Sequence, residues 1–142
     1  MMNVIVIGGS IGGAESVSAL IKNPAVGQID WIEAGDIGIV QGWGADTAAH
    51  IAQLRTQGVI VHDHTRVTRI DAAAHRIYAA SQAYKYDKLI LSLGSVPNRL
   101  PVPGADLQGV MALGQRESIL ALKRAAQTTP ALEHVVIIGA GY

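Results

Sequence analysis

A short apolar run that ends in a glycine-rich turn constrains this chain more than any other feature of its sequence. Residues 4–7 (VIVI) are apolar and β-branched, which is typical of a strand buried on both faces of a parallel sheet. The next six residues read GGSIGG, and an amphipathic stretch follows to residue 21. A second strand, residues 29–33 (IDWIE), ends in an acid, Glu33. This order predicts a β-α-β unit that binds a nucleotide.

Each small residue of the loop has a physical purpose in such a unit. Gly8 lets the backbone turn sharply out of the strand, and the small residues Gly9 and Ser10 let a pyrophosphate approach the main chain. Gly13 lets the helix pack closely on the sheet, and the helix N-terminus presents free N–H groups to the phosphates. Glu33, 20 residues beyond Gly13, accepts hydrogen bonds from ribose hydroxyls. A glycine-rich turn without a ligand is the alternative, and it explains fewer of these features.

Composition excludes several classes of protein. The 142 residues are 49% hydrophobic and 15% charged, with no phenylalanine, so we expect one domain whose core is built from Ile, Val, Leu and Ala. Eleven basic residues balance eleven acidic ones, which argues against a nucleic-acid-binding surface. No apolar run is long enough to span a membrane and no basic leader precedes the first strand, so we expect a cytoplasmic protein. The absence of cysteine excludes disulfides, thiolate chemistry and cysteine metal sites.

The middle of the chain continues the alternation and then changes character. A helix is expected over residues 46–56, and another buried strand over residues 59–61. Three short segments with aromatic and β-branched residues predict a small antiparallel meander over residues 65–70, 76–80 and 83–86. Residues 88–91 (KLIL) return to parallel-strand character. The predicted fold class is therefore α/β, a Rossmann-like parallel sheet with helices and a small antiparallel β-meander.

The C-terminal part begins with an extended segment and ends in a second strand-to-glycine junction. Three prolines between residues 97 and 103 force the extended conformation, and a helix is expected over residues 117–126. Residues 135–138 (VVII) then lead into the glycine-containing residues 139–142. Burying four such apolar side chains is favourable. We therefore expect residues 135–138 to dock as a strand on an edge of the chain's own sheet, or on that of a neighbouring copy in a homodimer.

These motifs together resemble the N-terminal FAD-binding part of the pyridine nucleotide-disulfide oxidoreductase family. The likeness is to the branch of NADH peroxidase, NADH oxidase and coenzyme A-disulfide reductase. Residues 86–95 (YDKLILSLGS) are similar to the second flavin motif of that family. The other segments that carry the resemblance are residues 4–15, 29–36, 58–71, 103–105 and 135–142.

The resemblance implies an FAD site and a division of the chain. Residues 1–114 would form the first segment of the FAD-binding domain, and residues 115–142 the connecting helix and first strand of a truncated NADH-binding domain. Glu33 would hold the adenosine ribose, and the Val67 backbone would lie near the adenine. The residues implied at the pyrophosphate are Gly8, Gly9, Ser10, Ile11, Gly12 and Gly13. Those implied on the flavin side are Ser92, Leu93 and Gly94.

Two departures from the family pattern concern its redox chemistry. The family's loop histidine falls at Ile11 here, and its redox cysteine falls at or beside Trp43. A tryptophan forms neither a thiolate nor a sulfenic acid. The later segments of the NADH-binding part and of the flavin site are also absent from this sequence. We therefore expect an FAD-binding domain of an NADH oxidase-like oxidoreductase that is incomplete and has no catalytic residues of its own.

Other interpretations stay open at this point. The same pocket would suit a module that binds ADP or AMP without redox activity, or the chain is a degenerate remnant that binds nothing. The histidines of residues 62–64 (HDH) would share one face of a strand and could begin a metal site. Further ligands are not evident, so no metal is expected. Trp31 is expected to fill space beside the second strand, and Trp43 is either a core residue or a flat surface against the flavin ring.

Overall fold

The structure, a computed structural model, describes residues 1–37, 47–114, 116–128 and 134–139. Two compact units make up the chain, Met1–Gly94 and Ser95–Tyr142. The first contains both β-sheets and two of the helices found in the described residues, and the second contains one helix. The division predicted between residues 114 and 115 separates an FAD-binding part from the start of an NADH-binding part. This division by function stays a prediction.

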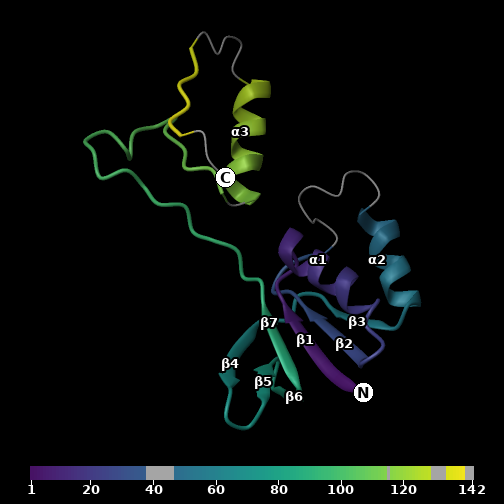
Figure 1. Ribbon diagram of the computed structural model, residues 1–142. Coiled ribbons are helices and arrows are strands. Elements are labelled where there is room, and N and C mark those ends of the chain that lie inside the picture. The colour runs from purple at the N-terminus through teal and green to yellow at the C-terminus, as the bar shows by residue number, and fades with distance from the viewer. Residues whose placement is uncertain (38–46, 115, 129–133, 140–142) are drawn as a thin grey trace. The chain divides into compact units, whose positions relative to one another are not determined.

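A four-stranded parallel sheet forms the centre of the first unit (Figure 1). Its strand order is β3-β2-β1-β7, built from β1 (Met2–Ile7), β2 (Val26–Ile32), β3 (Val59–His62) and β7 (Lys88–Leu91). The helices α1 (Ile11–Leu20) and α2 (Thr47–Thr56) cover one face of this sheet (Figure 1). The predicted Rossmann-like α/β fold is confirmed, including the helix expected over residues 46–56.

A three-stranded antiparallel meander covers the other face. It consists of β4 (Val67–Asp71), β5 (Arg76–Ala79) and β6 (Gln82–Lys85). Ala80 and Ser81 join β5 to β6 with φ angles of 47° and 67°, while Ala79 pairs with Gln82. Positive φ at both central residues is typical of a type I′ hairpin turn. The meander is therefore confirmed, but strand β5 ends one residue earlier than expected and β6 begins one residue earlier.

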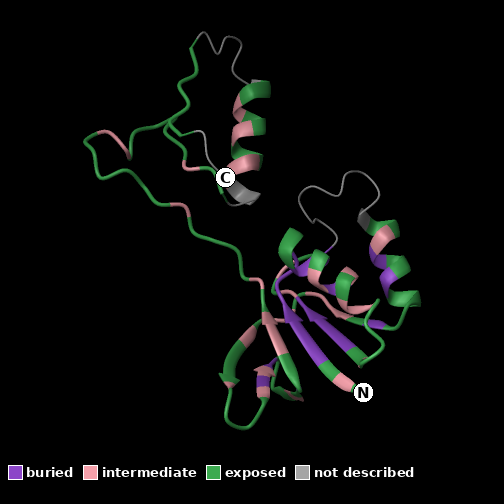
Figure 2. Ribbon diagram, viewed as in Figure 1, coloured by how far each residue is buried: buried purple, intermediate pink, exposed green. Residues whose placement is uncertain are grey.

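Alternate residues of the central strands pack into two separate cores. Strands β1 and β2 are buried over most of their length (Figure 2). Val6 of β1 packs on the helix side with Val17 and Trp31. Ile5 and Ile7 of the same strand pack on the meander side, in the cluster that contains Ile32, Ile77 and Tyr86. Because both faces of β1 are covered, the continuous apolar run of residues 4–7 is fully accounted for.

The second unit contains α3 (Arg116–Thr128), which confirms the helix expected over residues 117–126. The strand expected over residues 135–138 is not found, and neither sheet of the described residues includes these positions. Their side chains are between 64% and 84% exposed. The predicted docking of this segment on an edge of the chain's own sheet, or of the sheet of a neighbouring copy, stays a prediction. Within the described residues, no helix combines the length and apolar character needed to cross a membrane.

Candidate nucleotide-binding site

The four parallel strands end together at one edge of the sheet. Ile7 of β1 pairs with Ile32 on one side and with Leu91 on the other, and Ile32 pairs with His62. The chain places β2 and β3 on one side of β1 and β7 on its other side, so the strand order switches there. Open α/β sheets bind ligands in the crevice at such a switch point. The residues that leave the strands at this edge are Gly8, Glu33, Asp63 and Ser92.

The turn after β1 needs glycine at position 8. Gly8 has a φ of +116°, and its N–H donates to the carbonyl oxygen of Ile32 at 2.8 Å. A Cβ atom there would lie 2.0 Å from the carbonyl oxygen of Ser92. The Ser92 N–H in turn donates to the Ile7 carbonyl at 2.8 Å. The backbones of the first loop and of the β7 terminus are therefore in direct contact, with no room for a side chain between them.

Gly13 and Trp31 both contact the carbonyl oxygen of Gly8. A Cβ atom at Gly13 would lie 1.9 Å from this oxygen, so helix α1 packs on the loop as closely as the sequence predicts. The indole Nε1–H of Trp31 donates to the same oxygen at 2.9 Å, and Trp31 is fully buried. Trp31 therefore fills the space beside β2, as expected, and also supplies the hydrogen bond that a buried carbonyl requires.

Helix α1 begins without a side-chain cap. Ser10 is the N-cap residue and its hydroxyl makes no capping hydrogen bond, while the Ala14 N–H donates to the Ser10 carbonyl at 3.0 Å. The N–H groups of the first turn have no acceptor within a helix. They are available to an anion, and the helix dipole favours one there. The N-terminus of α1 lies close to Ser92, because a Cβ atom at Gly12 would lie only 2.6 Å from the Ser92 hydroxyl oxygen.

The Glu33 carboxylate is held by the backbone on both of its oxygens. Its Oε2 accepts a hydrogen bond from the Gly9 N–H, and its Oε1 accepts one from the Gly35 N–H at 2.9 Å. An ionised carboxylate offers about four acceptor positions, so both oxygens can still accept a hydroxyl each. The side chain is thus fixed in orientation while keeping acceptors for a pair of ribose hydroxyls.

A pocket of about 670 Å³ lies at this edge of the sheet. Eight of the eleven predicted cofactor-binding residues line it, namely Gly8, Gly9, Ser10, Glu33, Val67, Ser92, Leu93 and Gly94. Ile11, Gly12 and Gly13 do not line it. Gly12 and Gly13 allow the close packing of α1 beside the pocket, and the Ile11 side chain is 48% exposed.

The sequence did not identify most of the pocket wall that residues 65–70 supply. Beyond Val67, this wall contains Thr65, Arg66, Thr68, Arg69 and Ile70. The guanidinium carbon of Arg69 lies 3.7 Å from the centre of the Tyr78 ring, which orients that side chain. Two arginines, Arg66 and Arg69, thus line the same pocket as Glu33. The sequence did contain a signal for this wall, since four of residues 65–70 are polar and this segment follows the third parallel strand.

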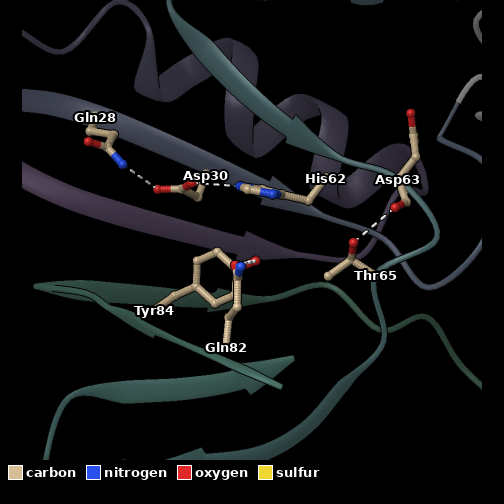
Figure 3. A network of polar contacts seen from close by, with 7 residues as sticks. All are labelled: Gln28, Asp30, His62, Asp63, Thr65, Gln82 and Tyr84. Atoms are coloured by element: carbon tan, nitrogen blue, oxygen red, sulfur yellow. Dashed lines mark hydrogen bonds and ion pairs between the residues drawn. The ribbon is translucent and has the colours of Figure 1, made fainter. Parts of the chain in front are cut away.

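The histidines of residues 62–64 do not share a strand face as the metal hypothesis supposed. Strand β3 ends at His62, and His64 has a φ of 49°, so the chain turns between them. The His62 Nε2 atom lies 2.7 Å from Asp30 Oδ1 (Figure 3). Among the residues that the structure describes, no group of three metal-ligating side chains is found.

Trp43, the position of the family's redox cysteine, lies outside the described residues.

Comparison with known proteins gives one family for nearly the whole chain. The family model described as pyridine nucleotide-disulphide oxidoreductase matches residues 2–142. The fold is similar to that of the water-forming NADH oxidase from Lactobacillus brevis bound to NADH, with a TM-score of 0.67 at 19% identity. That match covers 90% of this chain and 33% of the solved one.

Curated proteins are similar in sequence as well. The NADH oxidase of Lactococcus lactis subsp. cremoris (strain MG1363) is 31% identical over 101 residues, which is 66% of this chain and 22% of the relative. The rhodocoxin reductase of Rhodococcus erythropolis is 39% identical over 80 residues, which is 54% of this chain and 17% of the relative. The chain thus spans about a fifth of the length of these curated relatives.

Proposed function

Because the chain belongs to the pyridine nucleotide-disulphide oxidoreductase family, we propose that it serves as the FAD-binding part of an NADH oxidase-like enzyme. Members of this family are FAD-dependent NAD(P)H oxidoreductases, and FAD is the family's cofactor. The proposal assigns the FAD to the pocket at the carboxyl ends of β1, β2 and β7. It also assigns residues 1–114 to the FAD-binding domain and residues 115–142 to the start of a dinucleotide-binding part.

The observation that carries the proposal is the backbone cradle around Gly8. Main chain packs directly on main chain here, since a Cβ atom at Gly8 would collide with the Ser92 carbonyl and one at Gly13 with the Gly8 carbonyl. Such close packing brings the N-terminus of α1, with its free N–H groups, to the edge of the sheet where a pyrophosphate can bind. The acceptor side chain that a ribose needs, Glu33, lies on the same pocket. The residues therefore fit the phosphate and ribose of a dinucleotide.

The remaining predicted residues are assigned to the adenine and flavin ends of the cofactor. The Val67 backbone is proposed to lie near the adenine, at the meander side of the pocket. The terminus of β7, with Ser92, Leu93 and Gly94, is proposed to approach the flavin side. Glu33 would also disfavour a nucleotide that carries a 2′-phosphate, because the like charges would repel.

The flavin, when bound, supplies the chemistry of electron transfer. The residues of this chain bind and orient the cofactor, and with no cysteine in the sequence they offer no thiolate to pass electrons to a peroxide or a disulfide. We therefore propose that the chain by itself does not carry out thiol-dependent reduction. A cytoplasmic location stays a prediction.

The experiment that tests the proposal is a titration of the purified chain with FAD, ADP and AMP by calorimetry, after an absorbance spectrum for copurified flavin. We expect binding of FAD and ADP, with a flavin spectrum in the purified protein. Glu33→Lys should weaken ADP binding at least tenfold, because it removes the ribose acceptor. Gly58→Ala is the matched control, since a Cβ atom at that positive-φ glycine would meet nothing within 4 Å.

The same titration separates the alternatives. FAD bound no more tightly than ADP, with no flavin in the purified protein, would favour an adenine-nucleotide module without redox activity. No binding of FAD, ADP or AMP at millimolar concentration would contradict the proposal and favour a remnant that binds nothing.

A further inference from the structure

Asp63 is the member of the HDH triplet, residues 62–64, whose side chain hydrogen-bonds to the segment after Glu33. Its Oδ1 accepts a hydrogen bond from the Ile37 N–H at 3.0 Å, and its Oδ2 lies 3.3 Å from Arg55 Nη2. The hydroxyl of Thr65 donates to the Asp63 carbonyl at 2.9 Å (Figure 3). The Asp63 side chain is 32% exposed, whereas that of Arg55 is 53% exposed. The carboxylate therefore connects two loops at the edge of the pocket.

Backbone hydrogen bonds join the same two segments. The Glu33 N–H donates to the His62 carbonyl at 3.0 Å, and the Thr65 N–H donates to the Glu33 carbonyl at 2.8 Å. The His64 N–H donates to the Gly35 carbonyl at 2.9 Å. The loop after β2 thus runs alongside the loop after β3, beyond the last paired residues of the two strands. Asp63 adds a side-chain contact at the far end of this pairing, at Ile37.

The segment that Asp63 holds also sets the orientation of the Glu33 carboxylate. Gly35 lies between Glu33 and Ile37, its carbonyl accepts from His64, and its N–H donates to Glu33 Oε1. Ile37 is fully buried, so a shift at this position is transmitted to the rest of the loop. An acceptor for ribose hydroxyls must be held closely in place to distinguish a ribose from an analogue that lacks them.

We propose that Asp63 is a positioning residue for Glu33 and that it sets how strongly the site selects a ribose with free 2′ and 3′ hydroxyls. The inference rests on the proposed function, because it concerns the adenosine ribose of the bound nucleotide. Asp63 acts through the loop of residues 35–37 and does not itself touch the nucleotide. A residue with only a structural role would lower stability, or would weaken all nucleotides alike.

The test compares ADP with 2′,3′-dideoxy-ADP on the same protein by calorimetry. The wild-type chain should bind ADP about tenfold more tightly, since hydrogen bonds to the two hydroxyls are lost in the analogue. Asp63→Ala should lower this ratio to about one while leaving the affinity for the dideoxy analogue within about twofold. Asp63→Asn keeps an oxygen that accepts from the Ile37 N–H, so it should restore most of the ratio.

Arg55→Ala is the matched control, because it removes the exposed ion pair to the same carboxylate and leaves the contact to Ile37. Its ratio should equal that of the wild type. If Asp63→Ala does not fold, Asp63→Leu removes the acceptor, keeps a side chain that branches at Cγ, and carries the same expectation. An unchanged ratio in the alanine or leucine variant, or an equal loss for both nucleotides, overturns the inference. A wild-type chain that binds neither nucleotide overturns the proposed function itself.

Discussion

The imidazole Nε2 of His62 lies 2.7 Å from Oδ1 of Asp30, across neighbouring strands of the parallel sheet. Gln28 donates to the other carboxylate oxygen of Asp30 at 2.7 Å, and Tyr84 of the meander lies edge-on to the imidazole at a centroid distance of 5.3 Å (Figure 3). Asp30 is buried, at 7% exposure. A polar network therefore lies where the meander packs on the sheet, and a buried carboxylate requires such partners.

The first prediction concerns this network. Replacing His62 with alanine should lower the free energy of unfolding by about 2–4 kcal/mol, because Asp30 loses a partner while staying buried. Asp30→Asn should cost less, since the amide oxygen still accepts a hydrogen bond. Gln28→Ala is the control, because Gln28 is the other side-chain partner of Asp30 and its own position is exposed. Urea denaturation measures each difference, and equal midpoints for wild type and His62→Ala would contradict the prediction.

The second prediction concerns Trp31. Trp31→Phe keeps most of the apolar volume but removes the N–H that donates to the Gly8 carbonyl. The orphaned carbonyl should cost about 1–3 kcal/mol of stability. Because this oxygen belongs to the loop that we propose to bind the pyrophosphate, ADP affinity should also fall. Denaturation and calorimetry on one preparation measure both quantities, and a loss of stability without any change of affinity would mean that the hydrogen bond does not order the loop.

The third prediction concerns the close packing at Gly13. Gly13→Ala should reduce ADP affinity at least tenfold, since its Cβ would lie 1.9 Å from the Gly8 carbonyl and α1 must move. It should also cost about 1–3 kcal/mol of stability. Gly58→Ala introduces backbone strain at a φ of +90° with open space around it, and it should cost about 1 kcal/mol with unchanged affinity. Equal affinities for the two variants would show that the helix position is irrelevant to binding.

Local pattern was sufficient to predict the β1–loop–α1 unit. The apolar run of residues 4–7 predicted a strand covered on both faces, and the spacing of Gly8 and Gly13 predicted a sharp turn with a closely packed helix. The structure confirms both features, because each depends on residues that are close in the sequence.

Contacts across the sheet could not be predicted in the same way. The bond from Trp31 to Gly8 spans 23 residues, and that from Ile37 to Asp63 spans 26 residues. Both depend on the register between strands and on the course of the following loops, which hydrophobic periodicity does not specify. The turn at Ala80 and Ser81 was missed for a different reason, because neither residue type is typical of a type I′ turn.

The fourth prediction concerns turnover. The purified chain, supplied with FAD and NADH, should show no peroxide reduction and no disulfide reduction above the rate of free FAD. The physical reason is that the sequence contains no cysteine and therefore no thiolate to pass electrons onward. The measurement is NADH absorbance with and without peroxide, with free FAD and NADH as the control. A protein-dependent rate that rises with peroxide concentration would contradict this prediction.

The last prediction concerns residues 135–138, whose apolar side chains are mostly exposed. Burying all four would contribute about 6–12 kcal/mol as an upper bound, so a second copy of the chain that covered them would be strongly stabilised. We expect self-association in which this segment adds as a strand to a sheet edge of the partner copy. Deleting residues 134–142 should then lower the apparent mass in sedimentation velocity and reduce the thermal midpoint.

A full-length control separates loss of the apolar side chains from loss of the chain end. Replacing Val136 and Ile138 with lysine keeps the length and should abolish association as the deletion does, because charges would be desolvated in the paired strand. Concentration-dependent sedimentation that is the same for wild type, deletion and lysine variants, with equal thermal midpoints, would show that the segment contributes nothing to assembly. Any self-association would then have to involve another part of the chain, and the prediction for residues 135–138 would be wrong.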